Sequence, residues 1–189
     1  MSGVSEFVAA TNRLDRRFIV PLPAPEPRDW YAVYTFSHHE KQVTLQAESA
    51  GVDCFVPMYK SVRRWKDRRK ELELALFPSY VFVHIGLSER ISVLRLPGVV
   101  QIVSFGGKLA RLPEVEIDAL RAGMASHTLL HPHPYVTTGK KVRIRSGPMA
   151  GLEGVLVRRK QSCRVVLSID LIMRSVALEV DEADIEPLK

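Results

Sequence analysis

Cysteine is scarce in this chain of 189 residues, which carries only Cys54 and Cys163. Two cysteines this far apart do not suggest a disulfide framework, so a reducing cytoplasm is the expected compartment. No apolar run approaches the about 20 residues that a membrane-spanning helix needs. The start of the chain, residues 1–8, also lacks the basic and apolar parts of a secretion signal. The sequence therefore argues against secreted disulfide-rich proteins and membrane partners.

Catalytic patterns are missing as well. The chain has no phosphate-binding glycine loop, nucleophile elbow or paired catalytic acids. His38, His39, His131 and His133 suggest a metal site, but no Cys or acidic cluster stands at zinc-like spacing near them. We therefore expect no catalytic residues, no metal and no cofactor, and a metal-dependent enzyme is the least favoured class.

Positive charge is present in excess and is concentrated in two segments. The chain has 27 Lys+Arg against 21 Asp+Glu, a net charge of +6. Seven basic residues and one acid fall within residues 60–70, and nine basic residues and two acids fall within residues 140–174. Two separate basic surfaces favour a partner that carries phosphates, such as nucleic acid.

Proline marks two boundaries along the chain. Pro21, Pro23, Pro25 and Pro27 alternate with other residues, a spacing that forbids helix and favours extended chain, so we expect a disordered tail over residues 1–28. A second run, His131-Pro132-His133-Pro134, indicates a linker. These boundaries predict a first domain over 29–127, a linker over 128–135 and a second domain over 136–189.

The first domain is predicted to be α+β. Aromatic and β-branched residues predict a strand from Trp30, and Ser37 with Glu40 fits a capping box that opens a helix. The further elements expected in order are a strand over 52–57, a basic hairpin arm over 60–76, a central strand over 80–85, a short helix near 91–94, a strand over 99–105 and a helix over 113–126. This order suits a ferredoxin-like, split βαβ sandwich.

The second domain is predicted to be a small β-barrel. Val142 and Ile144 alternate with basic residues, which is typical of a half-buried strand with a basic outer face. Ser146-Gly147-Pro148 then turns the chain, and Gly154 within the next strand permits a bend or a close backbone approach.

The segment Gly139–Val157 resembles the KOW motif. Together with Trp30–Tyr34, His39–Lys41, Phe77–Val83 and Pro97–Val99, it makes residues 29–188 similar to the NusG family. The resemblance implies an NGN domain joined to an SH3-like KOW barrel. It also implies a monomeric, cytoplasmic, bacterial transcription elongation or antitermination factor that binds RNA polymerase, is not an enzyme, and suppresses pausing or termination.

The resemblance also assigns site residues. The positions matching the family's contact with the polymerase clamp helices are Tyr34, Phe77, Pro78, Tyr80 and Phe105. From the residues alone, core packing is the alternative for these side chains. The barrel loop that docks on partners matches Leu171 and Ile172. Because the family's usual Ile-Phe-Gly-Arg reads Leu171-Ile172-Met173-Arg174 here, Rho, the ribosomal protein NusE or neither remain open as partners.

The arm is the second candidate site. It resembles the hairpin of specialised paralogs such as RfaH and LoaP. Its basic residues could bind phosphates of the elongation complex while Trp65 stacks on a base, and the alternative is a solvated hairpin that protects a sheet edge. The candidate nucleic-acid-binding residues are Arg63, Arg64, Trp65, Lys66, Arg68 and Arg69.

Two alternatives stay open at this point. A ribosome-associated RNA-binding protein could use the same KOW barrel, although the preceding β-α-β domain argues against it. The barrel region could also fold as helices, as it does in RfaH. The β-branched run Val165–Ile169 and the breaks at Gly139, Gly147 and Pro148 favour strands.

Overall fold

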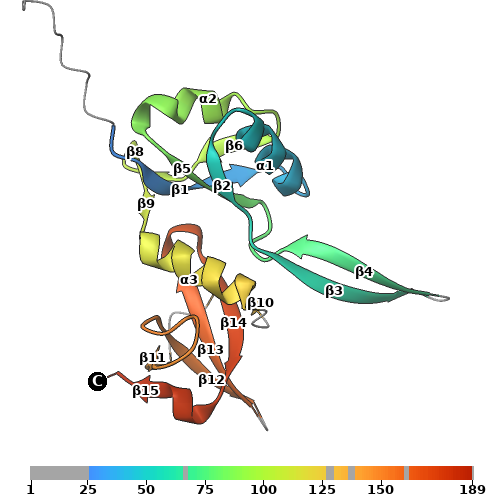
Figure 1. Cartoon of the computed structure of the whole chain (residues 1–189), viewed down its shortest axis with the longest axis vertical. Helices are drawn as coiled ribbons and strands as arrows, with labels where there is room; N and C mark the ends of the chain where they lie inside the picture. The colour runs from blue at the N-terminus through green and yellow to red at the C-terminus, as the bar shows by residue number, and fades with distance from the viewer. Residues whose placement is uncertain (1–25, 66–67, 127–129, 136–138, 160–161, 189) are drawn as a thin grey trace, which may run out of the picture.

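The computed structural model describes residues 26–188 except 66–67, 127–129, 136–138 and 160–161. It is an α+β structure with three α-helices and mostly strands, as the sequence predicts. Figure 1 shows an NGN domain with a projecting arm, a barrel domain below it, and helix α3 (Glu114–Ala125) where the two meet. Within the described ranges, no helix is both long and apolar enough to traverse a lipid bilayer.

The NGN sheet is antiparallel and has β1 (Asp29–Thr35) near its centre. Its order is β2-β5-β1-β6, with β9 also paired to β1. The flanking strands are β2 (Asp53–Phe55), β5 (Tyr80–Ile85), β6 (Val99–Ile102) and β9 (Arg111–Leu112). The split βαβ order predicted from the sequence is therefore present.

Alternation along β1 divides the domain into two apolar layers. Tyr31 and Val33 point to one face, where they pack with Val43 of α1 (Glu40–Ser49) and Val93 of α2 (Arg90–Leu94). Trp30 and Ala32 point to the opposite face and join a different cluster. Successive side chains of a strand face opposite sides, so a single strand serves both layers.

The expected capping box at the start of α1 does not form. The helix begins at Glu40 with His39 at the N-cap position, and no side chain caps it. The Glu40 carboxylate instead accepts a hydrogen bond from the Ser79 backbone N–H at 2.7 Å. Glu40 therefore makes a tertiary contact with Ser79 instead of the local cap that the sequence pattern predicts.

The arm is a two-stranded ribbon of β3 (Met58–Trp65) and β4 (Arg68–Ala75) that projects away from the domain (Figure 1). Ion pairs hold its base: Lys60 meets Glu71 at 3.1 Å, and Lys41 of α1 meets Glu73 at 2.5 Å. The side chains of residues 63–69 lie outside the described part.

Two short elements lead from the sheet to the barrel. After β6 the chain forms a small hairpin of β7 (Ser104–Phe105) and β8 (Lys108–Leu109). It then adds β9 beside β1 and enters α3 after Pro113, whose extended backbone precedes the first helical turn.

The barrel domain is one antiparallel sheet with the order β10-β14-β13-β12-β11-β15. Its strands are β10 (Leu130–His133), β11 (Lys140–Ile144), β12 (Glu153–Arg159), β13 (Ser162–Ile169), β14 (Arg174–Val180) and β15 (Ile185–Pro187). The prediction of strands rather than helices is confirmed for the described residues. The stretch expected as a linker contains β10, which lies along the edge of β14 from Leu130 to His133. An edge strand tolerates Pro132 because the N–H that proline lacks is not needed on its free side.

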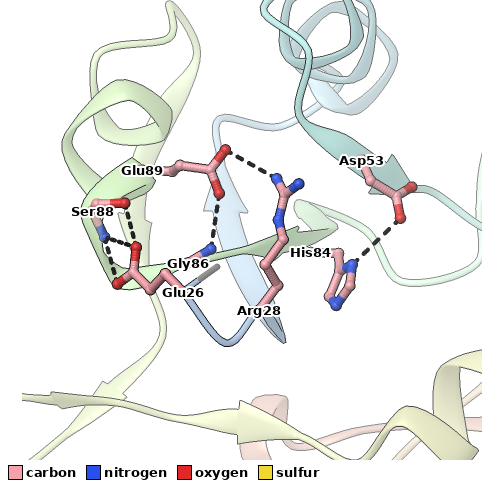
Figure 2. A network of polar contacts seen from close by, with 7 residues as sticks. All are labelled: Glu26, Arg28, Asp53, His84, Gly86, Ser88 and Glu89. Carbon is pink, nitrogen blue, oxygen red and sulfur yellow. Dashed lines mark hydrogen bonds and ion pairs between the residues drawn. The ribbon is translucent and has the colours of Figure 1, made fainter. Parts of the chain in front are cut away.

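The end of the predicted tail is anchored to the NGN domain. Glu26 accepts hydrogen bonds from the Ser88 backbone N–H and hydroxyl, and Arg28 pairs with Glu89 at 2.9 Å (Figure 2). Glu89 also accepts from the Gly86 N–H at 2.9 Å and so closes the start of the 3-10 helix η2 (Leu87–Glu89). Glu26 and Arg28 of the predicted tail therefore contact the NGN domain, and the rest of that tail, residues 1–25, lies outside the described residues.

Candidate functional site: the aromatic face of the NGN sheet and the barrel loop

The face of the NGN sheet opposite α1 is aromatic. Tyr34 and Tyr80 are cross-strand neighbours whose ring centroids lie 5.4 Å apart, and both are half-buried. Phe77 lies deeper, 1% exposed, and packs edge-to-face on Phe82 at 5.6 Å. A graded surface of this kind, with buried rings beneath half-buried ones, suits an interface anchored by a few aromatic side chains.

A strained turn presents Tyr80 at the start of β5. Ser79 has a φ of 66°, a left-handed conformation that non-glycine residues rarely adopt. Three hydrogen bonds hold the turn: Ser79 N–H donates to Glu40, Thr35 N–H donates to the Ser79 carbonyl at 2.9 Å, and Tyr80 N–H donates to the Phe77 carbonyl at 3.1 Å. These bonds place Tyr80 beside Tyr34.

The barrel loop reaches the same region. Leu171 and Ile172 lie in the 3-10 helix η3 (Asp170–Ile172), and both belong to the hydrophobic cluster that includes Phe77 and Phe82. Burial raises the pKa of the Tyr80 hydroxyl, and the positive charge of Arg174 partly opposes this shift. The two site regions predicted on separate domains therefore share one continuous cluster.

Helix α3 fills the space between the two domains. Its Arg121 guanidinium lies 4.6 Å from the Trp30 ring centroid and 3.3 Å from the Asp53 carboxylate. Two residues further along, Gly123 leaves room for Met149 of the barrel, because a Cβ on Gly123 would lie only 2.9 Å from the Met149 sulfur. The helix is thus fastened to the NGN sheet by Arg121 and accommodates the barrel at Gly123.

The predicted site residues differ in accessibility. Pro78 and Phe105 are exposed, the latter to 63%, whereas Ile172 is 5% exposed. The exposed apolar side chain of the barrel loop is Met173, at 66% and with a φ of 49°. The predicted nucleic-acid residues of the arm lie outside the described side chains, although the backbone register sets Arg63 opposite Lys70 and Arg64 opposite Arg69.

Sequence reasoning missed the part that α3 plays. Arg121 and Trp30 were not candidates, because nothing in the sequence around a single Arg in a helix indicates which aromatic ring it will contact. A glycine inside an otherwise good helix was a usable signal, because it often marks close packing. Gly123 fits that description.

Nothing described here forms a metal centre or a reactive thiol. Among the described residues, no three His, Cys, Asp or Glu side chains gather in a way that could hold a metal ion. Burial raises the pKa of the Cys54 thiol to about 11, and the nearby Glu48 and Asp53 carboxylates add to the shift. A thiol with so high a pKa is a poor nucleophile at neutral pH.

Comparison with known proteins agrees with this architecture. A ferredoxin-like domain with an arm, followed by a small barrel, defines the NGN–KOW class of two-domain proteins. The sequence model described as "NusG: Transcription termination factor nusG" matches residues 28–121. The chain belongs to the NusG family.

Curated relatives match over most of their length. The transcription termination/antitermination protein NusG of Helicobacter pylori strain J99 is 24% identical over 85% of this chain and 98% of its own. The proteins of the same name from Staphylococcus carnosus and Escherichia coli K12 are 27% and 25% identical, over 84% and 86% of this chain and 95% and 97% of theirs. A solved structure titled "Domain interaction in Thermotoga maritima NusG" has a TM-score of 0.55 at 22% identity, covering 86% of this chain and 98% of that one. This last likeness concerns the fold.

Proposed function

We propose that this chain is a non-catalytic transcription termination/antitermination factor that binds RNA polymerase through the aromatic face of its NGN domain. Family membership supports the class, and so do the names of the curated relatives. The observation that carries the docking surface is the Tyr34–Tyr80 pair, which presents half-buried rings beside the exposed Pro78. The proposed target is the pair of clamp helices of the polymerase.

The mechanism needs no chemistry from the protein. A factor that binds the closed clamp more tightly than the open clamp shifts the polymerase toward the closed, elongating state. Pausing and termination are disfavoured to the extent of that difference in affinity. The arm adds contacts to nucleic-acid phosphates, and the barrel recruits a further partner through Leu171 and Ile172.

The closed arrangement of the two domains has a consequence for docking. Phe77, Phe82 and Ile172 are all buried within the shared cluster, so a partner that uses them needs the barrel to move away from the NGN domain. Tyr34, Pro78 and Tyr80 remain partly accessible in the same arrangement. We infer that docking starts on these three residues and is completed as the domains separate.

The test is a pausing assay with a reconstituted elongation complex and the full chain. Tyr34→Ala/Tyr80→Ala should lose most of the effect on pause lifetime and weaken polymerase binding about tenfold or more, as expected for anchor residues. Leu45→Ala is the matched control, because Leu45 is 64% exposed on α1, which covers the other face of the sheet. Circular dichroism and thermal unfolding check that each variant is folded. Unchanged affinity in a folded double variant would contradict the docking surface, and binding to ribosomes without binding to polymerase would contradict the function.

A further inference from the structure

Glu40 is a buried carboxylate that contacts the turn before Tyr80 from the helix on the opposite face of the sheet. It is the first residue of α1 and is 7% exposed. Its Oε1 atom accepts a hydrogen bond from the Ser79 backbone N–H at 2.7 Å. Burial of a carboxylate is costly unless hydrogen bonds compensate for the lost water, and the bond to Ser79 supplies such compensation.

Both backbone groups of Ser79 are bonded to distant parts of the chain. The Ser79 carbonyl accepts a hydrogen bond from the Thr35 N–H of β1 at 2.9 Å, and the Ser79 N–H donates to Glu40. The left-handed backbone of Ser79, with its φ of 66°, is strained for a residue with a Cβ and persists where the surroundings impose it. Strand β1 provides one of these bonds through its backbone, whereas Glu40 provides the other through a side chain, which a substitution can remove.

Ser79 lies directly between two residues of the proposed docking surface. Pro78 is exposed, and the Tyr80 ring lies beside the Tyr34 ring with centroids 5.4 Å apart. Rotation about the Ser79 backbone would change the direction of Pro78 relative to Tyr80, because these two residues flank it. The bond from Glu40 therefore restricts how Pro78 and Tyr80 are presented together.

We propose that Glu40 is a positioning residue for docking to RNA polymerase. Its carboxylate holds the Ser79 turn, and the turn holds Pro78 and Tyr80 in the arrangement that the partner meets, while Glu40 itself is buried. The inference rests on the proposed docking surface. It predicts that positions 40 and 79 depend on each other, because Ser79→Gly adopts the same backbone without strain and does not need the bond.

The experiment measures the affinity of the full chain for core RNA polymerase by titration. Glu40→Ala leaves the buried Ser79 N–H without its acceptor, so affinity should fall about fivefold or more. Glu40→Gln keeps an acceptor oxygen and should cost about twofold at most. Ser79→Gly alone should bind about as tightly as wild type. In the Ser79→Gly background, Glu40→Ala should cost about twofold at most, because the two changes act on one interaction.

Two control variants separate positioning from general stability. Val43→Ala removes packing from the buried side of the same helix, where Val43 is 0% exposed, and should lower the free energy of unfolding without changing the affinity. Glu48→Ala removes an exposed carboxylate from α1 and should change neither quantity. All titrations are made at a temperature well below the unfolding midpoint of every variant.

Nuclear magnetic resonance observes the turn directly, in the absence of polymerase. In the wild type, Ser79 should show the strong Overhauser effect between its own N–H and Hα protons that a positive φ produces. The Tyr34 and Tyr80 rings should show Overhauser effects with each other. Glu40→Ala should weaken both signals, and adding Ser79→Gly should restore the contact between the rings.

The inference is overturned if Glu40→Ala keeps wild-type affinity while Tyr34→Ala/Tyr80→Ala loses binding, or if Ser79→Gly does not rescue the loss. A loss for Val43→Ala equal to that for Glu40→Ala would assign the effect to stability and would also reject positioning. If the double tyrosine variant binds normally, the docking surface is wrong and the inference falls with it. A failure confined to Glu40 leaves the docking surface standing, so the two failures are distinguishable.

Discussion

Among the residues that the structure describes, three non-glycine residues adopt left-handed backbone, and two of them lie in the candidate site. Ser79 precedes Tyr80, and Met173 follows Ile172, with φ values of 66° and 49°. The third, His38, lies in the turn between β1 and α1. Such residues cost about 1–2 kcal/mol each relative to glycine and persist where the surrounding structure imposes them. Their concentration beside Tyr80 and Ile172 is consistent with selection for what the side chains do there.

Met173 offers a direct test of that strain. Met173→Gly should raise the free energy of unfolding by about 1 kcal/mol, because glycine adopts this conformation without steric cost and the exposed Met side chain loses little packing. Thermal unfolding should show a midpoint higher by about 3 °C. Met173→Leu is the control, since it keeps a Cβ and should leave the midpoint unchanged. A Met173→Gly protein less stable than wild type would show that the side chain contributes to packing.

At the scale of elements, Arg121 of helix α3 makes several contacts with the NGN sheet. Its guanidinium covers Trp30, lies 5.3 Å from the Phe55 ring centroid and pairs with Asp53. His84 stacks on Trp30 at 5.0 Å and approaches the same Asp53 at 3.7 Å (Figure 2). The result is a closed ring of contacts between the helix and three strands.

Removing Arg121 should loosen this helix. Arg121→Ala should lower the free energy of unfolding by about 1 kcal/mol, a figure kept small because the side chain is 39% exposed. Denaturant unfolding measures the loss, and amide exchange should show faster opening in α3 than in α1. Arg111→Ala is the comparison, as Arg111 pairs with Asp29 at 3.1 Å, stacks on none of the rings in the described part of the chain, and is 64% exposed. Equal losses in the two variants would argue against a special role for the contact with Trp30.

The arm gives the second prediction at this scale. Changing its tip residues to Gln should reduce the salt dependence of binding to an assembled elongation complex, because each phosphate contact releases counterions. The residues changed are Arg63, Arg64, Lys66, Arg68 and Arg69. Lys60→Gln is the control at the base of the arm, where Glu71 already pairs with the lysine. If the slope of affinity against salt stays the same, the arm is a solvated hairpin.

Local sequence patterns predicted the helices and strands better than they predicted which residues or strands each element contacts. The aromatic and β-branched residues from Trp30 and the apolar run from Tyr80 correctly predicted two sheet strands, and the β-branched run Val165–Ile169 predicted a barrel strand. The capping box failed because Glu40 is drawn to Ser79, 39 residues away. Strand β10 was missed because the prolines that suggested a linker are also acceptable at a sheet edge.

The sequence alone could not predict that the two domains pack against each other. The apolar residues around Phe77 indicated a surface to be covered, but apolarity alone does not say whether a second protein or the same chain covers it. Leu171 and Ile172 carried the same ambiguity. Only the three-dimensional arrangement shows that these two surfaces meet each other.

At the scale of the whole molecule, polymerase binding and domain opening should be coupled. Gly123→Leu inserts a side chain where Met149 packs, so it should favour open chains. If the closed form hides part of the docking surface, affinity for polymerase should rise by about threefold or more. The measurement is a titration of core polymerase with the full chain. Ser126→Leu, at an exposed position on the C-terminal side of α3, is the control. Weaker binding of a folded Gly123→Leu protein would indicate that the closed form is the one that docks.

Strand β10 also limits how far the barrel can travel once it is released. Four residues separate Ala125 at the end of α3 from Leu130, so five Cα–Cα steps give a covalent reach of about 17 Å at full extension. If β10 leaves the edge of β14, the tether runs from Ala125 to Lys140 and its reach grows to about 50 Å. The shorter tether keeps the barrel at a high effective concentration near the NGN domain. The longer tether lowers that concentration and enlarges the volume that the barrel can reach. Four residues of edge strand thus determine whether an open chain recloses at once or reaches for a distant partner.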